Sequence, residues 1–567
     1  MFPEGANTAP SLYSCLKEVF MVKNPILRGF HPDHSLIRVG GDYYLATSTF
    51  EWAPGVRIYH SKDLAHWDYL TAPLDTYSKM DLRGVKASDG IWAPCLSHDG
   101  EYFYLIYTVV HDAREFPVMD TPNYLIRAKE ITGPWSDPVY LNSSGFDPSL
   151  FHDTDGRKWL LNMEWDYRKV LSGGNPFTGI LLQEYDPEKK QLTGEAKKIF
   201  TGSSIGSTEG PHLYRHDGYY YLMCAEGGTG WFHAVTLARS KALTGPYELS
   251  PEHPVLTSWE GSREPEEIEK ALAKKDLGQS YLKKAGHGSL VESPDGRWFL
   301  AHLCGRNIPG MLYCPLGRET AIQEVVWEDG WLKLKEGGHF PKETFRAVSD
   351  PETETEKRCD PLKKEYHFRD ESFLEDFQTL RSFFRDTGMT IREREGYLRI
   401  YGRESIFSRY EQAFLARRQT ELSFEAAVRF EFLPTSFQHG AGLIYRYDER
   451  NQYYVYVTLG ETGPELCLMT VINGQTKIEA SVPVKGLPGE MLPAYELSVS
   501  VKEDEVQFFR LDETGEKQKF GPQLHAFVLS DDFADGFTGA FTGVAVQDMK
   551  DRRNYADVAW FRYEEQA

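Results

Sequence analysis

The sequence has few cysteines, no long apolar run and no excess of positive charge. Its seven cysteines in 567 residues are scattered and form no CxxC pair or disulfide framework, which favours reduced thiols. No apolar stretch approaches the roughly 18 residues that a membrane-spanning helix needs. The N-terminal segment lacks a secretory h-region, because Lys17 and Glu18 interrupt its apolar residues. We therefore expect a cytoplasmic protein with no membrane partner.

The formal net charge of -21 makes nucleic acid an unsuitable partner, because a nucleic-acid-binding protein presents a basic face. The composition instead suits a neutral ligand. Aromatic residues make up 14% of the chain, and the enrichment in Tyr and Phe favours β structure. The length predicts two or three domains.

A Gly-centred turn followed by an aromatic, β-rich run occurs five times between residues 40 and 300. The turns are Gly40-Gly41-Asp42, Asp99-Gly100, Asp155-Gly156, Asp217-Gly218 and Asp295-Gly296. Glycine takes the positive φ that tight hairpin turns need. A second turn, Thr-Gly-Pro-aromatic, recurs at 132–135 and 244–247 and indicates entry into an outermost strand. Units of about 60 residues, each with around four strands, predict the blades of a five-bladed β-propeller.

One residue able to do chemistry lies eight or nine positions before each of these turns. The five residues are Asp33, Trp92, Asp147, Glu209 and His287. A fixed position in a repeated unit becomes a fixed position in space when the units surround an axis. The sequence therefore predicts that three carboxylates, a Trp and a His converge on one active site.

The pattern changes along the chain in a way that predicts four parts. A Glu-, Lys- and Ala-rich stretch at 260–284 has helical spacing and indicates an insertion between the last two blades. Beyond residue 366, short strand-like runs separated by polar turns predict a β-sandwich. The predicted parts are an N-terminal extension (1–23), a catalytic propeller (24–340), a linker (341–365) and the sandwich (366–567).

Three carboxylates in one cavity are typical of glycoside hydrolysis. An inverting reaction needs a base that activates water and a protonated acid about 6.5–9.5 Å away. The acid must keep its proton near neutral pH, and a nearby third carboxylate raises its pKa by repulsion. Any one of these acids alone would more often cap a turn, but their common phase favours the catalytic interpretation.

Trp92, His287 and Arg318 can each be interpreted either as structural residues or as parts of the active site. Trp92 offers a flat apolar face to a sugar ring, or packs in the core. His287 could be a buried structural residue, a substrate contact or an ion ligand, although no second His or Cys lies at zinc spacing. Arg318 is a candidate clamp for sugar hydroxyls, although a lone Arg is more often a surface charge.

These motifs together resemble family 43 of the glycoside hydrolases, in particular its two-domain β-xylosidases. The resemblance covers nearly the whole chain after residue 23. The segments that carry it are Ser48–Trp52, Ala225–Gly228, Cys314–Gln323 and Phe537–Phe541.

The resemblance implies an inverting, exo-acting enzyme without a required cofactor. It assigns Asp33 as general base, Glu209 as general acid and Asp147 as the residue that tunes the acid. A concanavalin-like sandwich would close the pocket with Phe537, or as second choice Phe541. The implied sugar contacts are Phe50, Trp92 and Arg318, and His287 would lie beneath the site, where relatives hold a calcium ion or water. Such relatives are commonly dimers or tetramers, so we expect a homo-oligomer.

Three departures from the family pattern bear on the leaving group. His34 follows the predicted base where Pro is familiar, Ala53 follows Trp52 where a bulky aromatic is usual, and the segment 307–313 is short. We expect these changes to reshape the outer pocket and to leave the reaction class intact.

The leading hypothesis is an exo-1,4-β-xylosidase acting on short xylo-oligosaccharides, with α-L-arabinofuranosidase activity, alone or in addition, as the alternative. Retaining fructan hydrolases would require Asn-Asp-Pro and Arg-Asp-Pro motifs, which the sequence lacks. A non-catalytic sugar-binding propeller would be expected to have lost at least one of the three acids. The sandwich could also be an independent carbohydrate-binding module, but the resemblance favours a lid.

Overall fold

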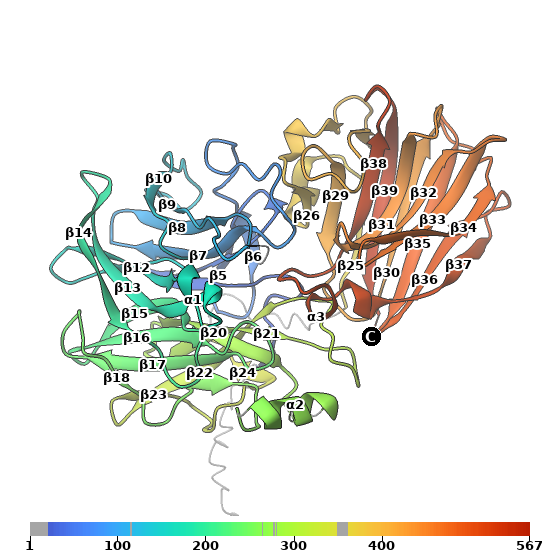
Figure 1. The fold of residues 1–567 in the computed structure, drawn as a ribbon. Coiled ribbons are helices and arrows are strands. Elements are labelled where there is room, and N and C mark those ends of the chain that lie inside the picture. The colour runs from blue at the N-terminus through green and yellow to red at the C-terminus, as the bar shows by residue number, and fades with distance from the viewer. Residues whose placement is uncertain are drawn as a thin grey trace, which may run out of the picture.

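The computed structural model contains two all-β domains that lie side by side (Figure 1), a propeller and a sandwich coloured orange to red at its C-terminal end. This confirms the predicted fold class. The described residues are 21–113, 116–263, 265–275, 278, 280–348 and 361–566. Most of the predicted N-terminal extension and the middle of the predicted linker lie outside them.

Five antiparallel sheets of four strands each, one with a short additional strand, form the blades. From the axis outward, the first blade is β2 (Ser35–Val39), β3 (Asp42–Thr47), β5 (Arg57–Ser61), β6 (Asp68–Thr71). The second is β7 (Gly90–His98), β8 (Phe103–Val110), β9 (Asn123–Ala128), β10 (Val139–Asn142). The third is β11 (Ser149–His152), β12 (Lys158–Trp165), β13 (Phe177–Asp186), β14 (Gln191–Phe200). The fourth is β15 (Glu209–His216), β16 (Tyr219–Glu226), β17 (Ala234–Ser240), β18 (Glu248–Leu249), and the additional strand β19 (Leu256–Thr257) pairs with β17. The fifth is β20 (Lys283–Glu292), β21 (Trp298–Gly305), β22 (Glu319–Glu328), β23 (Trp331–Leu334).

The first strands of neighbouring blades contact one another in a closed ring, β2–β7–β11–β15–β20–β2. Middle strands such as β8 are buried along their whole length, because neighbouring blades cover both faces of each sheet. Outside this ring, β1 (Met21–Lys23) pairs with β24 (Thr344–Arg346) in a two-stranded sheet. Val22 and Phe345 of this sheet belong to a hydrophobic cluster with residues of blades one and five. Asn24 adds side-chain hydrogen bonds with the backbone of Ile322 in blade five. Residues 21–23, which we assigned to the extension, and residues 344–346, which we assigned to the linker, therefore pack on the propeller.

The predicted turns lie where the sequence placed them. In each blade a Gly with positive φ joins the first two strands, and in blade one it is Gly40 rather than Gly41. The predicted insertion contains the helix α2 (Pro265–Ala273), which lies between β19 and β20. Another short helix, α1 (Tyr167–Leu171), follows β12 beside the axis.

The sandwich consists of two facing antiparallel sheets. The first has the order β27 (Met389–Thr390), β28 (Leu398–Tyr401), β39 (Tyr555–Glu565), β30 (Phe424–Phe432), β35 (Ala494–Lys502), β36 (Glu505–Leu511), β37 (Lys517–His525), with β25 (Lys363–Tyr366) on β39. The second has the order β34 (Gln475–Pro483), β33 (Pro464–Ile472), β32 (Asn451–Leu459), β31 (His439–Asp448), β38 (Phe541–Asp548), β29 (Ala413–Arg418), β26 (Phe377–Leu380), β4 (Trp52–Ala53). Their inner faces share one hydrophobic core. The short helix α3 (Asp531–Ala534) precedes β38 and lies near the propeller (Figure 1).

The two domains are joined through a strand that they share. β4 comes from blade one but pairs with β26 at the edge of the second sandwich sheet. The Trp52 ring is fully buried and stacks on Phe541 with centroids 3.7 Å apart. Phe30 and Phe50 of the propeller belong to the same buried aromatic cluster. The interface is therefore a continuous core rather than a surface contact.

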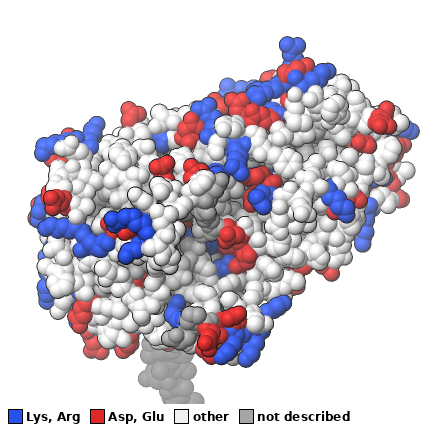
Figure 2. Space-filling view, in the orientation of Figure 1, with Lys and Arg blue, Asp and Glu red and all other residues white. Residues whose placement is uncertain are grey.

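On the face seen in Figure 2, Lys and Arg side chains are interspersed with Asp and Glu rather than gathered in one field. Among the described helices, none has the length and hydropathy required to cross a bilayer. The five cysteines in the described part of the chain are buried thiols.

Candidate active site

A pocket of about 780 Å³ opens at the propeller axis where it meets the sandwich. This volume lies in the range of small-molecule sites. The structure brings all eight candidate side chains together in its lining: Asp33, Phe50, Trp92, Asp147, Glu209, His287, Arg318 and Phe537.

Left-handed backbone at the start of each blade directs these side chains to the axis. Asp33, Asp147 and His287 have φ values of 51°, 54° and 48°. In the other two blades the following residue, Ala93 or Gly210, is left-handed instead, and the inner strand there shifts register. Such conformations are costly for residues other than glycine and are concentrated at functional sites. The repeated strain marks the position at which all five blades contribute to the pocket.

Asp33 is held as a hydrogen-bond acceptor on both of its carboxylate oxygens. Arg318 Nη1 donates to Oδ1 at 2.6 Å, and Ser48 Oγ donates to Oδ2 at 2.8 Å. Ser48 is oriented in turn by the Ala93 N–H, which donates to its Oγ at 2.8 Å. His287 Nδ1 lies 3.7 Å from Asp33 Oδ1. The carboxylate therefore has a fixed orientation and accepts charge-assisted bonds.

Glu209 and Asp147 form the protonated side of the site. Burial raises the pKa of Glu209 well above its ordinary value, and the charges of Asp147 and then Asp33 raise it further. Burial, followed by the charge of Asp33, raises the pKa of Asp147 to about 8. The Gly210 N–H donates to Asp147 Oδ2 at 3.0 Å and so links the two acids. The pair holds a proton at neutral pH and titrates as a unit.

Gly210 leaves room for no side chain. A Cβ at this position would lie 3.0 Å from His287 Nε2 and 3.2 Å from the Ala225 Cβ, and its φ is 55°. The residue before Glu209 is also fixed, because Thr208 Oγ1 donates to Glu226 at 2.7 Å. Close packing on both sides thus sets the direction of the Glu209 side chain.

Aromatic rings form the walls of the pocket around the carboxylates. The Trp92 ring centroid lies 5.8 Å from that of Phe50 and 5.3 Å from that of Phe537. Ser88 ties two of them, since its carbonyl accepts from Trp92 Nε1 and its Oγ accepts from the Phe537 N–H. Phe541 is buried against Trp52, whereas Phe537 lines the pocket.

The pocket lining also contains residues that the sequence analysis did not select. They are mostly apolar and include Met119, Phe146, Trp165 and Phe177. Trp165 is the last residue of β12. Only its place in the β-rich run after the Asp155-Gly156 turn could have indicated it. Ser48 begins one of the segments that carry the family resemblance, but the neighbouring sequence does not indicate its hydrogen bond with Asp33.

The three departures that we expected to reshape the pocket lie elsewhere. Ala53 is in β4, paired with Thr379 of the sandwich. Ile308, in the short segment 307–313, is buried in the sandwich core. His34 is fully buried, with its ring 6.3 Å from that of His287, and does not reach the rim. None of them lines the pocket, so that expectation was wrong. Packing against the sandwich takes up Ala53 and Ile308, and His34 is buried within the propeller itself.

The surroundings of His287 do not fit a calcium ion. Calcium prefers six to eight oxygen ligands, whereas His287 is next to the imidazoles of His34 and His212. The nearby Asp33 oxygen is already bound to Arg318. Burial, with the charges of His212 and Arg318, lowers the pKa of His287 to about 3, so its ring is neutral. A group of three metal-type side chains in the described part of the chain, His439, Asp548 and Asp551, lies on the sandwich instead.

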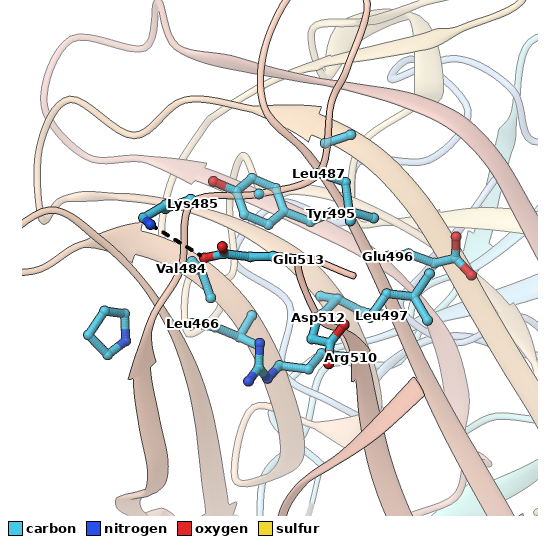
Figure 3. Close-up of a pocket in the computed structure, with 14 residues that line it drawn as sticks. Leu466, Val484, Lys485, Leu487, Tyr495, Glu496, Leu497, Arg510, Asp512 and Glu513 are labelled. Atoms are coloured by element: carbon cyan, nitrogen blue, oxygen red, sulfur yellow. Dashed lines mark ion pairs between the residues drawn. The ribbon is translucent and has the colours of Figure 1, made fainter. Parts of the chain in front are cut away.

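The sandwich also has a small hollow of its own between β33, β35 and β36 (Figure 3). Lys485 and Glu513 pair across its rim at 4.0 Å. Its volume of about 30 Å³ admits a water molecule but not a sugar ring. This hollow is therefore unsuited to sugar binding.

Comparison with known proteins agrees with the geometry of the site. Residues 22–332 match the family model "Glycosyl hydrolases family 43", and residues 365–564 match "Beta xylosidase C-terminal Concanavalin A-like domain". The chain belongs to glycosyl hydrolase family 43. It is thus a glycoside hydrolase, built as a catalytic propeller followed by the concanavalin-like domain.

Similar proteins match this family 43 chain over almost its whole length. "Xylosidase/arabinosidase 43B" of Humicola insolens is 45% identical, over 96% of this chain and 97% of that protein. "Beta-xylosidase" of Bacillus subtilis is 41% identical over 96% and 99%. The crystal structure of xylan beta-1,4-xylosidase from Bacillus halodurans superposes with a TM-score of 0.87 at 46% identity, covering 96% of this chain and all of that one.

Proposed function

We propose that the protein is an inverting exo-glycosidase that releases terminal β-1,4-linked D-xylose from short xylo-oligosaccharides. The observation that carries the proposal is that two carboxyl groups in one pocket have different surroundings. Asp33 is paired with Arg318, whereas burial and neighbouring carboxylates raise the pKa of Glu209. One carboxyl group that is paired with a cation and one that retains its proton are the arrangement that acid–base hydrolysis needs.

In this mechanism, Glu209 gives its proton to the glycosidic oxygen as the bond from that oxygen to the anomeric carbon breaks. Asp33 takes a proton from the water that attacks the anomeric carbon from the opposite face. The products are xylose of inverted configuration and a shortened chain with a free hydroxyl. Asp147 accepts a hydrogen bond from the Gly210 N–H, which holds the backbone beside Glu209. In its ionised form, Asp147 raises the pKa of the acid.

The aromatic walls of the pocket suit a sugar ring. Phe50, Trp92 and Phe537 present apolar faces of the kind that pyranose C–H groups contact, and the Phe537 ring is supplied by the second domain. The names of the two relatives described above support xylose as the sugar. Because one of them is named for both activities, a second activity on α-L-arabinofuranosides is the other candidate.

The test compares Glu209→Gln with the unaltered enzyme on xylobiose and on 2,4-dinitrophenyl β-D-xylopyranoside. Loss of the acid should lower kcat on xylobiose by about 10²–10⁴-fold, but far less on the activated substrate, whose leaving group needs no proton. Glu328→Gln, an exposed carboxylate at the end of β22, is the matched control and should change neither.

Proton NMR of the first product tests the stereochemistry, and α-xylose is expected. β-Xylose as the first product would refute inversion, and equal loss on both substrates would refute the acid role of Glu209. The ratio of kcat/KM on aryl β-D-xylopyranoside and aryl α-L-arabinofuranoside measures the second activity.

A further inference from the structure

A buried cation lies between the domains, close to the pocket but outside it. Lys284 is in β20, three residues before His287, and its side chain is 2% exposed. Its Nζ lies 2.7 Å from Asp532 Oδ1 and 3.0 Å from Asp531 Oδ2, and over the Trp231 ring at 4.7 Å. Its backbone is left-handed, with φ of 54°.

Such a cluster is costly unless its geometry is well satisfied, because three charges have lost their water. Here Lys284 faces two carboxylates from the first turn of α3 in the sandwich. Asp532 Oδ2 also accepts from the Cys314 N–H at 2.9 Å. The cluster thus attaches the start of α3 to two segments of blade five.

Only a few residues separate this attachment from the Phe537 ring. The Gly536 N–H donates to the Asp531 carbonyl at 3.1 Å, and a Cβ on Gly536 would lie 2.2 Å from the Tyr447 hydroxyl. Phe537 is then bonded through its N–H to Ser88 and through its carbonyl to Arg318. The segment 531–537 is therefore fixed to blade five at its start and to the pocket wall at its end.

We propose that Lys284, Asp531 and Asp532 are positioning residues that set the Phe537 ring over the sugar site. This role rests on the proposed function, in which Phe537 contacts the terminal sugar. Without the cluster, the start of the segment 531–537 keeps its packing on the sandwich core but loses its attachment to blade five. The Phe537 ring then shifts relative to Trp92 and Arg318. Sugar binding then weakens, although none of the three residues touches the sugar.

The test neutralises the cluster as a whole, by Lys284→Met with Asp531→Asn and Asp532→Asn, so that no buried charge is left unpaired. The KM for aryl β-D-xylopyranoside should rise about 10-fold or more, since small displacements of a positioned group are costly, with a smaller change in kcat. Lys284→Arg, which keeps the charge, should retain most of the wild-type KM.

A double-mutant cycle with Phe537→Ala separates positioning from general destabilisation. If the cluster acts through Phe537, neutralising it in the Phe537→Ala background changes KM by less than twofold. Glu421→Gln is the control, because it breaks another ion pair between the domains, with Arg306, that is not on the segment 531–537. It should leave KM unchanged. Additive effects of the cluster and Phe537, or an equal effect of Glu421→Gln, would overturn the proposal.

Amide hydrogen exchange gives a readout that does not depend on the reaction. Exchange at residues 535–541 should accelerate at least 10-fold in the neutralised variant and stay unchanged in Glu421→Gln. Unchanged exchange would overturn the proposal even in an active enzyme. Inactivity of the unaltered protein on xylosides, with accelerated exchange in the variant, would overturn the proposed function and leave the positioning of this segment supported.

Discussion

Replacing Asp147 with Asn should move the alkaline limb of the pH profile to lower pH. Burial, the charge of Asp147 and the charge of Asp33, in that order, raise the pKa of Glu209. Asn keeps an oxygen that can accept the Gly210 N–H, so the geometry of the acid is preserved. The substitution therefore removes one of the two neighbouring charges with little other change.

The magnitude follows from the repulsion between neighbouring carboxylates. A nearby charge typically changes a pKa by about one to three pH units, and one unit corresponds to about 1.4 kcal/mol. Because burial and Asp33 still act on Glu209 in the variant, we expect the alkaline pKa of kcat/KM to fall by about one to two units. Above that limb, kcat/KM should be about 10–100-fold below that of the unaltered enzyme.

The assay is the pH dependence of kcat/KM on xylobiose, where protonation of the leaving group matters. Asp155→Asn, an exposed change of equal charge in the turn of the same blade, is the control and should leave the profile in place. An alkaline limb that stays fixed in Asp147→Asn, or moves to higher pH, would refute the argument that Asp147 raises the pKa of Glu209.

Three further predictions concern the sandwich and its union with the propeller. Trp52→Ala should lower the free energy of unfolding by about 3–5 kcal/mol, because the ring is fully buried on Phe541; a loss below about 1 kcal/mol in urea titration would contradict this. Burial alone would raise the pKa of Glu431, but Arg394 and backbone N–H groups lower it to about 2. Ionised Glu431 therefore contributes to the free energy of unfolding above its ordinary pKa of 4.5, and this contribution is lost as the pH falls towards 2. In Glu431→Gln, the stability measured by thermal unfolding should depend less on pH on the acid side. Deleting residues 366–567 should abolish activity on soluble oligosaccharides, and a folded propeller with unchanged kcat/KM would show that the sandwich is no lid.

The repeated features of this chain could be predicted from sequence, because each of them recurs as a short sequence pattern in every blade. The Gly turns set the hairpins, and a constant offset from them placed Asp33, Trp92, Asp147, Glu209 and His287 at equivalent positions around one axis. Periodicity predicted that they meet. It could not predict the left-handed backbone that directs them, because in four of the five blades the left-handed residue is not glycine and the strain there is imposed by tertiary packing.

Contacts between distant segments were outside the reach of such patterns. Ala53 and the segment 307–313 were expected at the rim of the pocket, since a change of size at a predicted loop suggests a change of its opening. The structure places Ala53 in a sandwich sheet and buries Ile308 of that segment in the sandwich core. The choice of partner for a two-residue strand depends on which sheet edge lies next to it, and no local sequence pattern specifies that edge.

The shared strand explains why the pocket depends on both domains. Phe50 forms a wall of the pocket, and Trp52, two residues later, is in the sandwich sheet. On the other side, Phe537 reaches the pocket four residues before β38, the strand that begins with Phe541 under Trp52. Phe50 and Phe537, with ring centroids 6.3 Å apart, are thus each joined by a short segment to the same stacked pair, Trp52 on Phe541. A displacement of that pair would shift both rings relative to the carboxyl groups at the propeller axis, so the shape of the pocket depends on the core between the domains and not on either domain alone.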